Sequence, residues 1–533
     1  MSAGHPSRFD DTGRRHATSD RWTITRLARP NRLWGSNGVA FGPDGRLYVA
    51  QFLGGQISAV DLATGDVEVV VPPDGPVQAP DDLAFGADGA MYIADLVPGR
   101  VWRCGPRGEY RLVSDQVRVP NGITCVGDRL FVNEMRTHGR LLELFPDGGE
   151  PVVLTDGLAM GNAMQLGPDG CLYYPHMLTN QVFRIPPDGG TPELVAADLP
   201  EPVAVRFDRG GVLTVLSRGA AGIVTRIDLS GTGDRTTITS GVAGLDNAAF
   251  GPDNRMYVSS FASGGVTELH PDGRTREIVR RGLDGPFGVT IDLAGTPHVA
   301  DHYGLADPRH PDGVTTRELL TFVHGIAADH GLLHLTSQYG QVRSYDPVSR
   351  SVRERARGLD QPLGIAARPD GSLVVAESGA GRVLAIDDSD AVTVLAEGLD
   401  RPVDVTLDAE QRCYVSDEQR GTVYRIDDGT LVPVAEGLGA PQGLAVRDDE
   451  LYVVEAAHRR LRAISLGTGE SRIDAEHLAV GLPPGITRAD PDLFCHGLPG
   501  TPRRFAGLAV SPDGSLYLSA DGEGTVLHLT PAG

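Results

Sequence analysis

Short apolar segments alternate with turn residues along almost the whole chain. Each copy of the pattern has a short apolar strand, a turn rich in Pro, Asp and Gly, and a strand in which apolar and polar residues alternate, as in NGVAFGPDGRLYVA (37–50) and DLAFGADGAMYIA (82–94). A third and a fourth strand follow, such as QISAVDL (56–62) and EVVVP (68–72). Apolar residues at every second position, with turn residues at short intervals, predict an all-β fold.

The pattern recurs twelve times with a period of roughly 40 residues, which predicts four-stranded blades that bury their faces against one another. Two six-bladed rings are the natural division of twelve copies, so we predict two tandem six-bladed β-propellers. The first strands begin at Asn37, Asp81, Asn121, Asn162, Val203, Asp246, Phe287, His324, Leu363, Val403, Gln442 and Ala506.

The ends of the repeats suggest domain boundaries. We expect a disordered tail at 1–21, a first propeller at 22–273 and a second at 274–533. Repeat twelve has three strands, and an unassigned strand (22–28) precedes repeat one. We expect residues 22–28 to complete the sixth blade and residues 275–281 to complete the twelfth, which would remove open sheet edges.

A long insertion, 468–505, interrupts repeat eleven and is rich in Pro and Gly. Long loops in compact domains often serve as lids or binding loops. A surface insertion without a function is the alternative.

Composition narrows the function. All 48 basic residues are arginine, so lysine Schiff-base chemistry and a P-loop lysine are excluded, and we expect no organic cofactor. A net charge of −22 argues against nucleic-acid and anionic-membrane partners, and leaves a small-molecule substrate or a protein partner. The polar N-terminus and five scattered cysteines suggest a cytoplasmic protein.

Polar residues gather where propeller strands would meet at one mouth. In the first ring, five of the six first strands begin with an oxygen-bearing side chain, and Glu134 and His176 stand at second-strand ends. We expect a divalent cation here, Ca²⁺ rather than Mg²⁺ or Zn²⁺, because hard cations take carboxylate and amide oxygens. Turn capping by Asn and Asp is the alternative. The expected cation-binding residues are Asn37, Asp81, Asn121, Asn162 and Asp246.

The second mouth is mostly apolar at its strand starts. His302, His324 and Glu455 stand around it, and such a group could bind a transition metal or transfer protons. The alternative is that the histidines are hydrogen-bonded residues of the polar rim.

The repeats resemble those of the SMP-30/gluconolactonase/LRE-like propellers and of NHL-repeat proteins. SNGVAF (36–41), PDDLAF (80–85) and PNGI (120–123) are similar to that family's cation-binding segments, which implies ligand roles for Asn37, Asp81 and Asn121. The family's glutamate ligand has no counterpart in this chain. Virginiamycin B lyase, a related propeller, uses a cation with His and Glu, and this resemblance extends the interpretation to Glu134 and His176.

The leading hypothesis is a cation-dependent enzyme that hydrolyses a lactone or ester of a small oxygen-rich molecule, with His176 or Glu134 moving the proton. A C–O lyase, isomerase or cyclase using the same funnel is the second hypothesis. A double propeller that only binds a ligand or protein is the third.

Overall fold

The computed structural model describes residues 8, 17–231, 233–309, 315–318 and 320–532. These residues form twelve four-stranded antiparallel sheets, one two-stranded sheet and one 3-10 turn, η1 (Met177–Thr179). The all-β prediction is therefore confirmed, and four-stranded antiparallel sheets of this kind are those of β-propellers. Within this part of the chain, no helix has the length and apolar character needed to cross a membrane.

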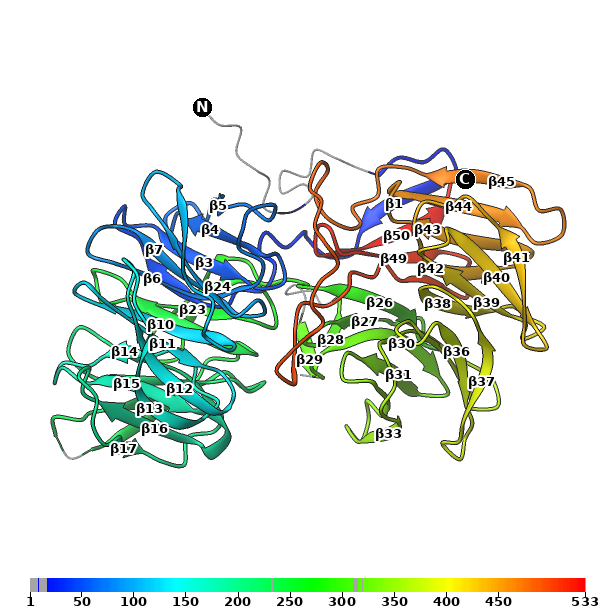
Figure 1. Cartoon of the computed structure of the whole chain (residues 1–533). Helices are drawn as coiled ribbons and strands as arrows, with labels where there is room; N and C mark the ends of the chain where they lie inside the picture. Colours follow the sequence, from blue (N-terminus) through cyan, green and yellow to red (C-terminus); the bar gives the residue numbers. More distant parts are fainter. Residues whose placement is uncertain (1–7, 9–16, 232, 310–314, 319, 533) are drawn as a thin grey trace. The chain divides into compact units, whose positions relative to one another are not determined.

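The chain divides into two compact units with six four-stranded sheets each (Figure 1). Among the described residues, unit 1 contains 32–281 and 485–502, and unit 2 contains Arg8, 17–31, 282–484 and 503–532.

The sheets of unit 1 are, in chain order, β2 (Val39–Phe41), β3 (Leu47–Gln51), β4 (Gln56–Val60) and β5 (Val67–Val71); β6 (Pro80–Phe85), β7 (Met91–Asp95), β8 (Arg100–Cys104) and β9 (Tyr110–Ser114); β10 (Pro120–Val126), β11 (Arg129–Glu134), β12 (Thr137–Leu144) and β13 (Val152–Ala159); β14 (Gln165–Leu166), β15 (Leu172–His176), β16 (Gln181–Ile185) and β17 (Glu193–Ala196); β18 (Pro202–Phe207), β19 (Leu213–Ser217), β20 (Ile223–Ile227) and β21 (Arg235–Thr239); β22 (Leu245–Phe250), β23 (Met256–Ser260), β24 (Val266–Leu269) and β25 (Thr275–Val279). The small hairpin β46 (Phe494–Cys495) and β47 (Leu498–Pro499) also belongs to this unit.

The sheets of unit 2 are β26 (Pro286–Ile291), β27 (Pro297–Asp301), β28 (Gly304–Asp307) and β29 (Thr315–Glu318); β30 (Val323–Asp329), β31 (Leu332–Ser337), β32 (Gln341–Tyr345) and β33 (Val352–Ala356); β34 (Pro362–Ala367), β35 (Leu373–Glu377), β36 (Arg382–Ile386) and β37 (Val392–Glu397); β38 (Pro402–Leu407), β39 (Cys413–Asp417), β40 (Thr422–Asp427) and β41 (Thr430–Ala435); β42 (Pro441–Arg447), β43 (Glu450–Glu455), β44 (Arg460–Ser465) and β45 (Ser471–Ala475); β48 (Leu508–Val510), β49 (Leu516–Ala520), β50 (Thr525–Pro531) and β1 (Trp22–Arg26).

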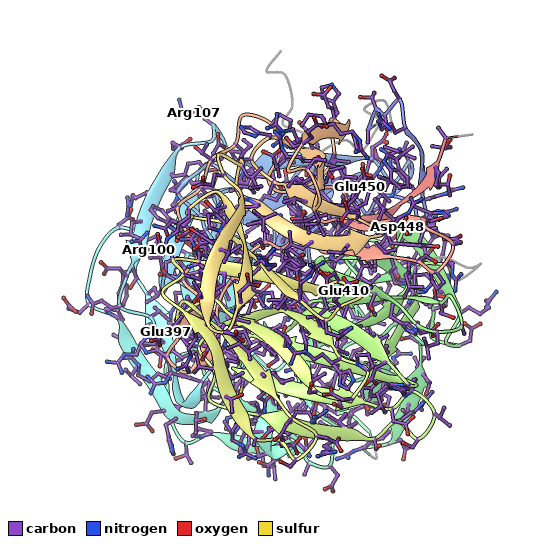
Figure 2. All side chains as sticks on the ribbon, turned by 90° about the vertical axis from the view of Figure 1, so that its right-hand side faces the viewer. Arg100, Arg107, Glu397, Glu410, Asp448 and Glu450 are labelled. Atoms are coloured by element: carbon purple, nitrogen blue, oxygen red, sulfur yellow. The ribbon has the colours of Figure 1, made fainter. Side chains whose placement is uncertain are left out.

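The Pro-Asp-Gly segments form the tight turns between first and second strands. In the first sheet, the Asp44 carboxylate accepts a hydrogen bond from the Arg46 backbone N–H (3.1 Å), and Gly45 adopts a φ of 80° that only glycine reaches without strain. Charged side chains face solvent at turns and strand ends, as Glu397, Glu410 and Asp448 do in Figure 2.

In each unit, the first strand of every sheet contacts the first strand of the next, and the sixth sheet contacts the first. In unit 1, the Ser259 hydroxyl in the sixth sheet donates to the Asn37 carbonyl that precedes the first sheet (2.5 Å). In unit 2, the Gly507 N–H before the sixth sheet donates to the Phe287 carbonyl of the first (2.9 Å). Apolar clusters fill the spaces between neighbouring sheets.

The strands that complete the two sixth sheets are the reverse of those expected. β25 completes the sixth sheet of unit 1, because a short Asp-Gly turn at 272–273 joins it to β24. β1 pairs with β50 in the last sheet of unit 2, where the labelled strands lie side by side in Figure 1. The expected boundary at 273 and the assignment of 22–28 to the first ring are therefore wrong.

The expectation of a disordered tail at 1–21 concerns mostly residues 1–7 and 9–16, which lie outside the described residues. The described remainder of this segment contacts unit 2. Arg8 is buried, and Thr18 pairs with Glu476 through two backbone hydrogen bonds of 2.9 Å.

Candidate functional site

The five expected cation-binding residues are all buried at the starts of first strands in unit 1. At three of them the register between the first and second strands shifts: at Asp81, at Asn121 and at Asp246. A bulge of this kind re-aims a side chain away from the regular alternation. This explains how polar residues at strand starts are brought together.

Asp81 is the centre of the group. Its carboxylate accepts hydrogen bonds from the side-chain amides of Asn37 (3.3 Å) and Asn121 (2.5 Å). The amide oxygens of both asparagines are buried and have no hydrogen-bonding partner in the described part of the chain. Asn37 and Asn121 thus both bind the Asp81 carboxylate through their amide nitrogens, and the amide oxygen of each is not used in a hydrogen bond with a described residue.

Asn162 lies near this group through sulfur contacts. Its amide nitrogen is 3.6 Å from the Met135 sulfur and 3.5 Å from the Met177 sulfur, and the Asn121 amide nitrogen is 3.1 Å from the same Met135 sulfur. The Asn162 amide oxygen accepts the Ala163 N–H at 2.7 Å. Sequence reasoning missed both methionines, which follow the second strands and carry no polar signal.

Asp246 is the second carboxylate of the group. No described residue donates a hydrogen bond to its carboxylate. Burial and the charge of Asp82 raise the pKa of Asp246 to about 7, opposed by Arg218 and Arg206. Burial, then the charges of Asp246 and Asp82, raises the Asp81 pKa well above its usual value. The two carboxylates therefore repel each other in a buried site.

A buried hydrogen-bond network next to these residues connects several sheets of unit 1. The Arg206 guanidinium donates to the Asn247 amide oxygen (2.5 Å) and to the carbonyls of Ala248 and Met164 (2.8 and 3.0 Å). The Asn247 amide donates to Asp82 (3.0 Å). Burial raises the Asp82 pKa to about 6, and the Arg206 charge opposes this shift. The network thus holds two charged residues, Arg206 and Asp82, close enough to the site to influence its carboxylates.

The Arg206 network was not predicted from the sequence, although Arg206 is unusual at its position in the repeat. Arg206 is the fifth residue of β18 (Pro202–Phe207), three positions after the repeat start at Val203. The same position in the other repeats of unit 1 holds Ala, Thr or Gln, as at Ala40, Ala84, Thr124, Gln165 and Ala249. A single arginine at a position where the other repeats have uncharged residues indicates that this side chain makes a specific contact.

Glu134, an expected proton carrier, is fully buried and bound by protein groups. It accepts the Arg118 N–H (2.9 Å), and Arg140 donates to it from its backbone (3.1 Å) and guanidinium (2.6 Å). Burial raises the pKa of this carboxyl, but these donors outweigh burial and lower it. Glu134 is therefore held ionised in a structural contact.

The same contact recurs through the repeats. A side chain at the end of the second strand accepts a backbone N–H from the loop that precedes the first strand of its own sheet. Such residues brace the loops between sheets, and they are Gln51, Asp95, Glu134, Asp301, Glu377, Asp417 and Glu455.

His176, the other expected proton carrier, packs against aromatic rings. Its ring centroid is 4.5 Å from that of Phe183 and 5.6 Å from that of Tyr174. Burial lowers its pKa to about 4, and none of the described residues forms a hydrogen bond with its Nε2 atom. The next residue, Met177, is the one that contacts Asn162.

In unit 2, the expected histidines come together but Glu455 does not join them. The rings of His302 and His324 are 5.7 Å apart, and Phe287 stacks on His324 at 5.1 Å. Their four nitrogens lack partners within hydrogen-bonding geometry among the residues that the structure describes, and burial lowers both pKa values, that of His324 to about 4. Glu455 instead binds Arg460 and Arg462 at 2.7 Å.

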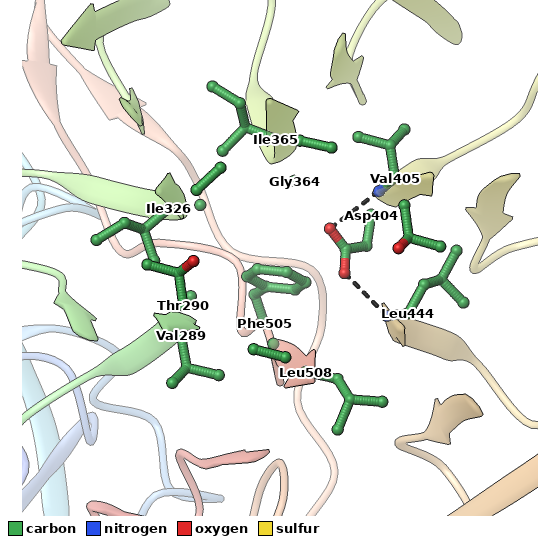
Figure 3. Close-up of a pocket in the computed structure, with 17 residues that line it drawn as sticks. Val289, Thr290, Ile326, Gly364, Ile365, Asp404, Val405, Leu444, Phe505 and Leu508 are labelled. Atoms are coloured by element: carbon green, nitrogen blue, oxygen red, sulfur yellow. Dashed lines mark hydrogen bonds between the residues drawn. The ribbon is translucent and has the colours of Figure 1, made fainter. Parts of the chain in front are cut away.

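A cavity of about 120 Å³ follows the first strands of unit 2 (Figure 3). Phe505 lines it and also packs with Phe287, Leu363 and Val403. Asp404 also lines it, and its carboxylate accepts the N–H groups of Val405 and Leu444, both at 2.9 Å. Burial raises the Asp404 pKa to about 8. The cavity is small, and its lining combines apolar side chains with polar backbone atoms and the Asp404 carboxylate.

Part of the expected insertion packs with unit 1. Residues 485–502 belong to that unit, and the Arg488 guanidinium donates to the carbonyls of Gly54 (3.3 Å) and Gln78 (2.6 Å). Gly54 lies between β3 and β4, and Gln78 precedes β6. The contact is thus at the end of the sheets where Asn37 and Asp81 begin their strands.

The first group suits a hard cation better than a soft one. Within the described ranges, no three His, Cys, Asp or Glu side chains are arranged to hold a metal ion. A cation here would therefore depend on amide oxygens beside Asp81 and Asp246. The two unpartnered amide oxygens and the two repelling carboxylates fit an oxygen-preferring ion.

No protein-family model and no curated protein matches the chain. Solved propeller structures do align with it. A streptogramin B lyase is 17% identical (TM-score 0.39), covering 52% of this chain and 95% of its own. An inactive virginiamycin B lyase variant from Staphylococcus aureus with quinupristin is 15% identical (TM-score 0.39; 59% and 96%). A protein described as a gluconolactonase is 16% identical (TM-score 0.39; 50% and 99%).

Proposed function

We propose that the chain forms two six-bladed β-propellers, and that the first binds a divalent cation and hydrolyses a lactone or ester of a small oxygen-rich molecule. The unbroken series of contacts between first strands in each unit, with the sixth sheet against the first, supports closed rings. Ca²⁺ is the proposed ion in preference to Mg²⁺ or Zn²⁺, because amide and carboxylate oxygens surround the site.

One observation carries the proposal: Asp81 and Asp246 are buried, their charges repel, and the amide oxygens of Asn37 and Asn121 beside Asp81 have no partner among the described residues. A buried polar atom without a partner costs about 1–3 kcal/mol, and a repelling pair adds to this. A cation held by Asn37, Asp81, Asn121, Asn162 and Asp246 would remove both costs. When bound, it would polarise a substrate carbonyl and stabilise the negative charge that develops on its oxygen.

We assign the proton transfer to Asp246 in place of His176 and Glu134. Asp81 already accepts two amide hydrogen bonds, whereas the Asp246 carboxylate accepts none from the described residues. Glu134 is bound to Arg140, and His176 is packed against Phe183. One Asp246 oxygen can therefore contact the cation while the other takes a proton from an attacking water, and no protein contact is broken.

A second candidate follows from the same two carboxylates. Two buried carboxylates that repel each other tend to share one proton near neutral pH, so that one acts as acid and the other as base. Such a pair would serve a lyase, isomerase or cyclase, and it would need no cation.

The test is a lactone and ester substrate screen with the parent chain, with and without a calcium chelator, and with Asp246→Asn. The hydrolase proposal predicts activity that the chelator abolishes and that Asp246→Asn lowers by about 10²–10⁴-fold. Asp147, fully exposed in a turn of the same unit, provides the control Asp147→Asn, which should keep full activity. Hydrolysis that persists in chelator would overturn the cation's role, and activity that survives Asp246→Asn would overturn the assignment of the base.

A further inference from the structure

Arg8 occupies a pocket inside unit 2. Its side chain is buried, with 1% of the residue exposed. One guanidinium nitrogen, Nη1, donates to the Leu283 carbonyl (3.2 Å), and Nη2 donates to the carbonyls of Asp284 (2.9 Å) and Asp521 (2.8 Å). Three carbonyls from two separate segments therefore hold one planar group.

A glycine makes room for the guanidinium. Gly524 lies beside the group with a φ of 68°, and a Cβ atom there would lie 2.5 Å from the Leu283 carbonyl oxygen and 2.6 Å from Arg8 Nη1. A side chain at position 524 would thus be strained and would also fill the space that the guanidinium occupies.

The pocket also has the charge for a buried cation. The carboxylates of Asp284, Asp521 and Asp301 attract the Arg8 guanidinium, and Arg504 repels it. Burial lowers the Arg8 pKa to about 9, and the aspartates oppose that shift, so the group stays protonated at neutral pH. Acidic groups thus outnumber basic ones around the guanidinium, which favours a cation in this place.

Unit 2 builds this pocket from its own repeats. Asp301 accepts the N–H groups of Asp284 and Gly285, and Asp521 accepts the Gly481 N–H. These are the loop-bracing contacts that recur at second-strand ends in other sheets. Arg8, by contrast, lies outside every strand of the fold. The pocket is therefore part of the scaffold, and the arginine is an addition to it.

We propose that this pocket is a binding site for an arginine side chain, occupied within the chain by Arg8, and that the guanidinium of another molecule can replace it. The three-carbonyl cradle and the flat space beside Gly524 favour a guanidinium over an ammonium. The site is separate from the proposed hydrolase site and does not depend on it.

The test uses the full chain with Arg8→Ala and measures binding of N-acetyl-arginine amide by calorimetry. We expect the variant to bind one equivalent, and the parent to bind at least about tenfold more weakly because Arg8 competes. N-acetyl-lysine amide should bind Arg8→Ala at least about tenfold more weakly than the arginine probe. Arg29→Ala, which removes an exposed arginine of the same unit, should behave as the parent does.

Two further arms complete the test. Free L-arginine that binds Arg8→Ala as tightly as the amide would identify a small guanidino compound as the ligand, whereas selective binding of the amide would identify an arginine within a peptide. Adding Asp284→Asn to Arg8→Ala should weaken binding by about tenfold, since a charge-assisted attraction is lost.

If Arg8→Ala does not fold, Arg8→Lys keeps the charge and loses the planar fork, and the arginine amide should displace the lysine. A folded Arg8→Ala or Arg8→Lys chain that binds none of these probes at millimolar concentration would overturn the proposal and leave Arg8 a purely structural residue.

Discussion

Carboxylates serve two purposes in this chain, and their neighbours distinguish them. Those at second-strand ends, such as Glu134 and Glu455, are saturated with N–H and guanidinium donors. Those at first-strand starts, Asp81 and Asp246, have few or no donors among the described residues, and the charge of Asp246 raises the pKa of Asp81. The first kind maintains the fold, and the second kind is available for chemistry.

Replacing Glu134 by Gln should therefore destabilise unit 1 without a specific effect on catalysis. Its buried charge is shared by Arg140 and the Arg118 N–H, and breaking such a pair costs about 3 kcal/mol. Glu455→Gln, at the equivalent place in unit 2, should cost a similar amount there. Urea unfolding and hydrogen exchange of the loop at 115–119 measure the effect. Slowed hydrolysis at unchanged stability would restore Glu134 as a proton carrier.

Asp246 should make the cation-free protein less stable as pH rises. Its folded pKa of about 7 exceeds the unfolded value, so the folded state binds the additional proton between about pH 4 and 7 and loses this advantage above that range. Asp246→Asn should consequently stabilise the chain more at about pH 8 than at about pH 5, by at most about 3 kcal/mol. Urea unfolding in chelator measures this difference, and equal effects at both pH values would contradict it.

The four-stranded sheet recurs along the whole described chain, but the strand that completes the last sheet of a unit can come from a distant part of the sequence. Apolar alternation and Pro-Asp-Gly turns predicted the strands themselves, because both signals are local. β1 pairs with β50, about 500 residues later in the chain, and nothing in WTITR specifies that partner. The short turn between β24 and β25 was the better local signal for the sixth sheet of unit 1.

The candidate site was predictable to a similar extent. The aligned strand starts located Asn37, Asp81 and Asn121, which the structure brings together. The bulges that aim these residues are irregularities of strand pairing within a sheet, and the Arg206 network reaches Asp82 through Asn247, 165 residues later in the chain, so neither has a local sequence signal. The proton-transfer roles expected for Glu134 and His176 rested on their positions at second-strand ends. Their neighbours in the structure, Arg140 and Phe183, argue against those roles.

Trp22→Ala should destabilise unit 2 alone, because β1 belongs to its last sheet. Trp22 is 6% exposed, its ring packs on Tyr452 at 5.9 Å, and its N–H donates to Asp474 (3.0 Å). Loss of a buried Trp costs about 3–5 kcal/mol. Trp34→Ala is the matched change in unit 1. Hydrogen exchange should rise in β49 and β50 for the first variant and in β2–β4 for the second; increased exchange in unit 1 for Trp22→Ala would contradict the pairing.

At the scale of the whole molecule, the strand order predicts which fragment is self-sufficient. Every four-stranded sheet of unit 1 is completed within residues 32–281, whereas a fragment 1–272 lacks β25 and carries an unpaired β1. Fragment 30–281 should therefore be monomeric and unfold cooperatively, and fragment 1–272 should aggregate through its open edge. Size-exclusion chromatography and thermal unfolding compare the two, and equal behaviour would argue against β25 as the completing strand.

The central claim is that the polar group of unit 1 binds a divalent cation, and calcium titration by calorimetry tests it most directly. The parent chain, stripped of metal, should bind one Ca²⁺ in this site. Asp81→Asn keeps the shape but removes a full charge, so it should bind at least about tenfold more weakly, while the exposed control Asp147→Asn should match the parent. Binding by Asp81→Asn as tight as that of the parent, or no binding by the parent at millimolar Ca²⁺, would contradict the account.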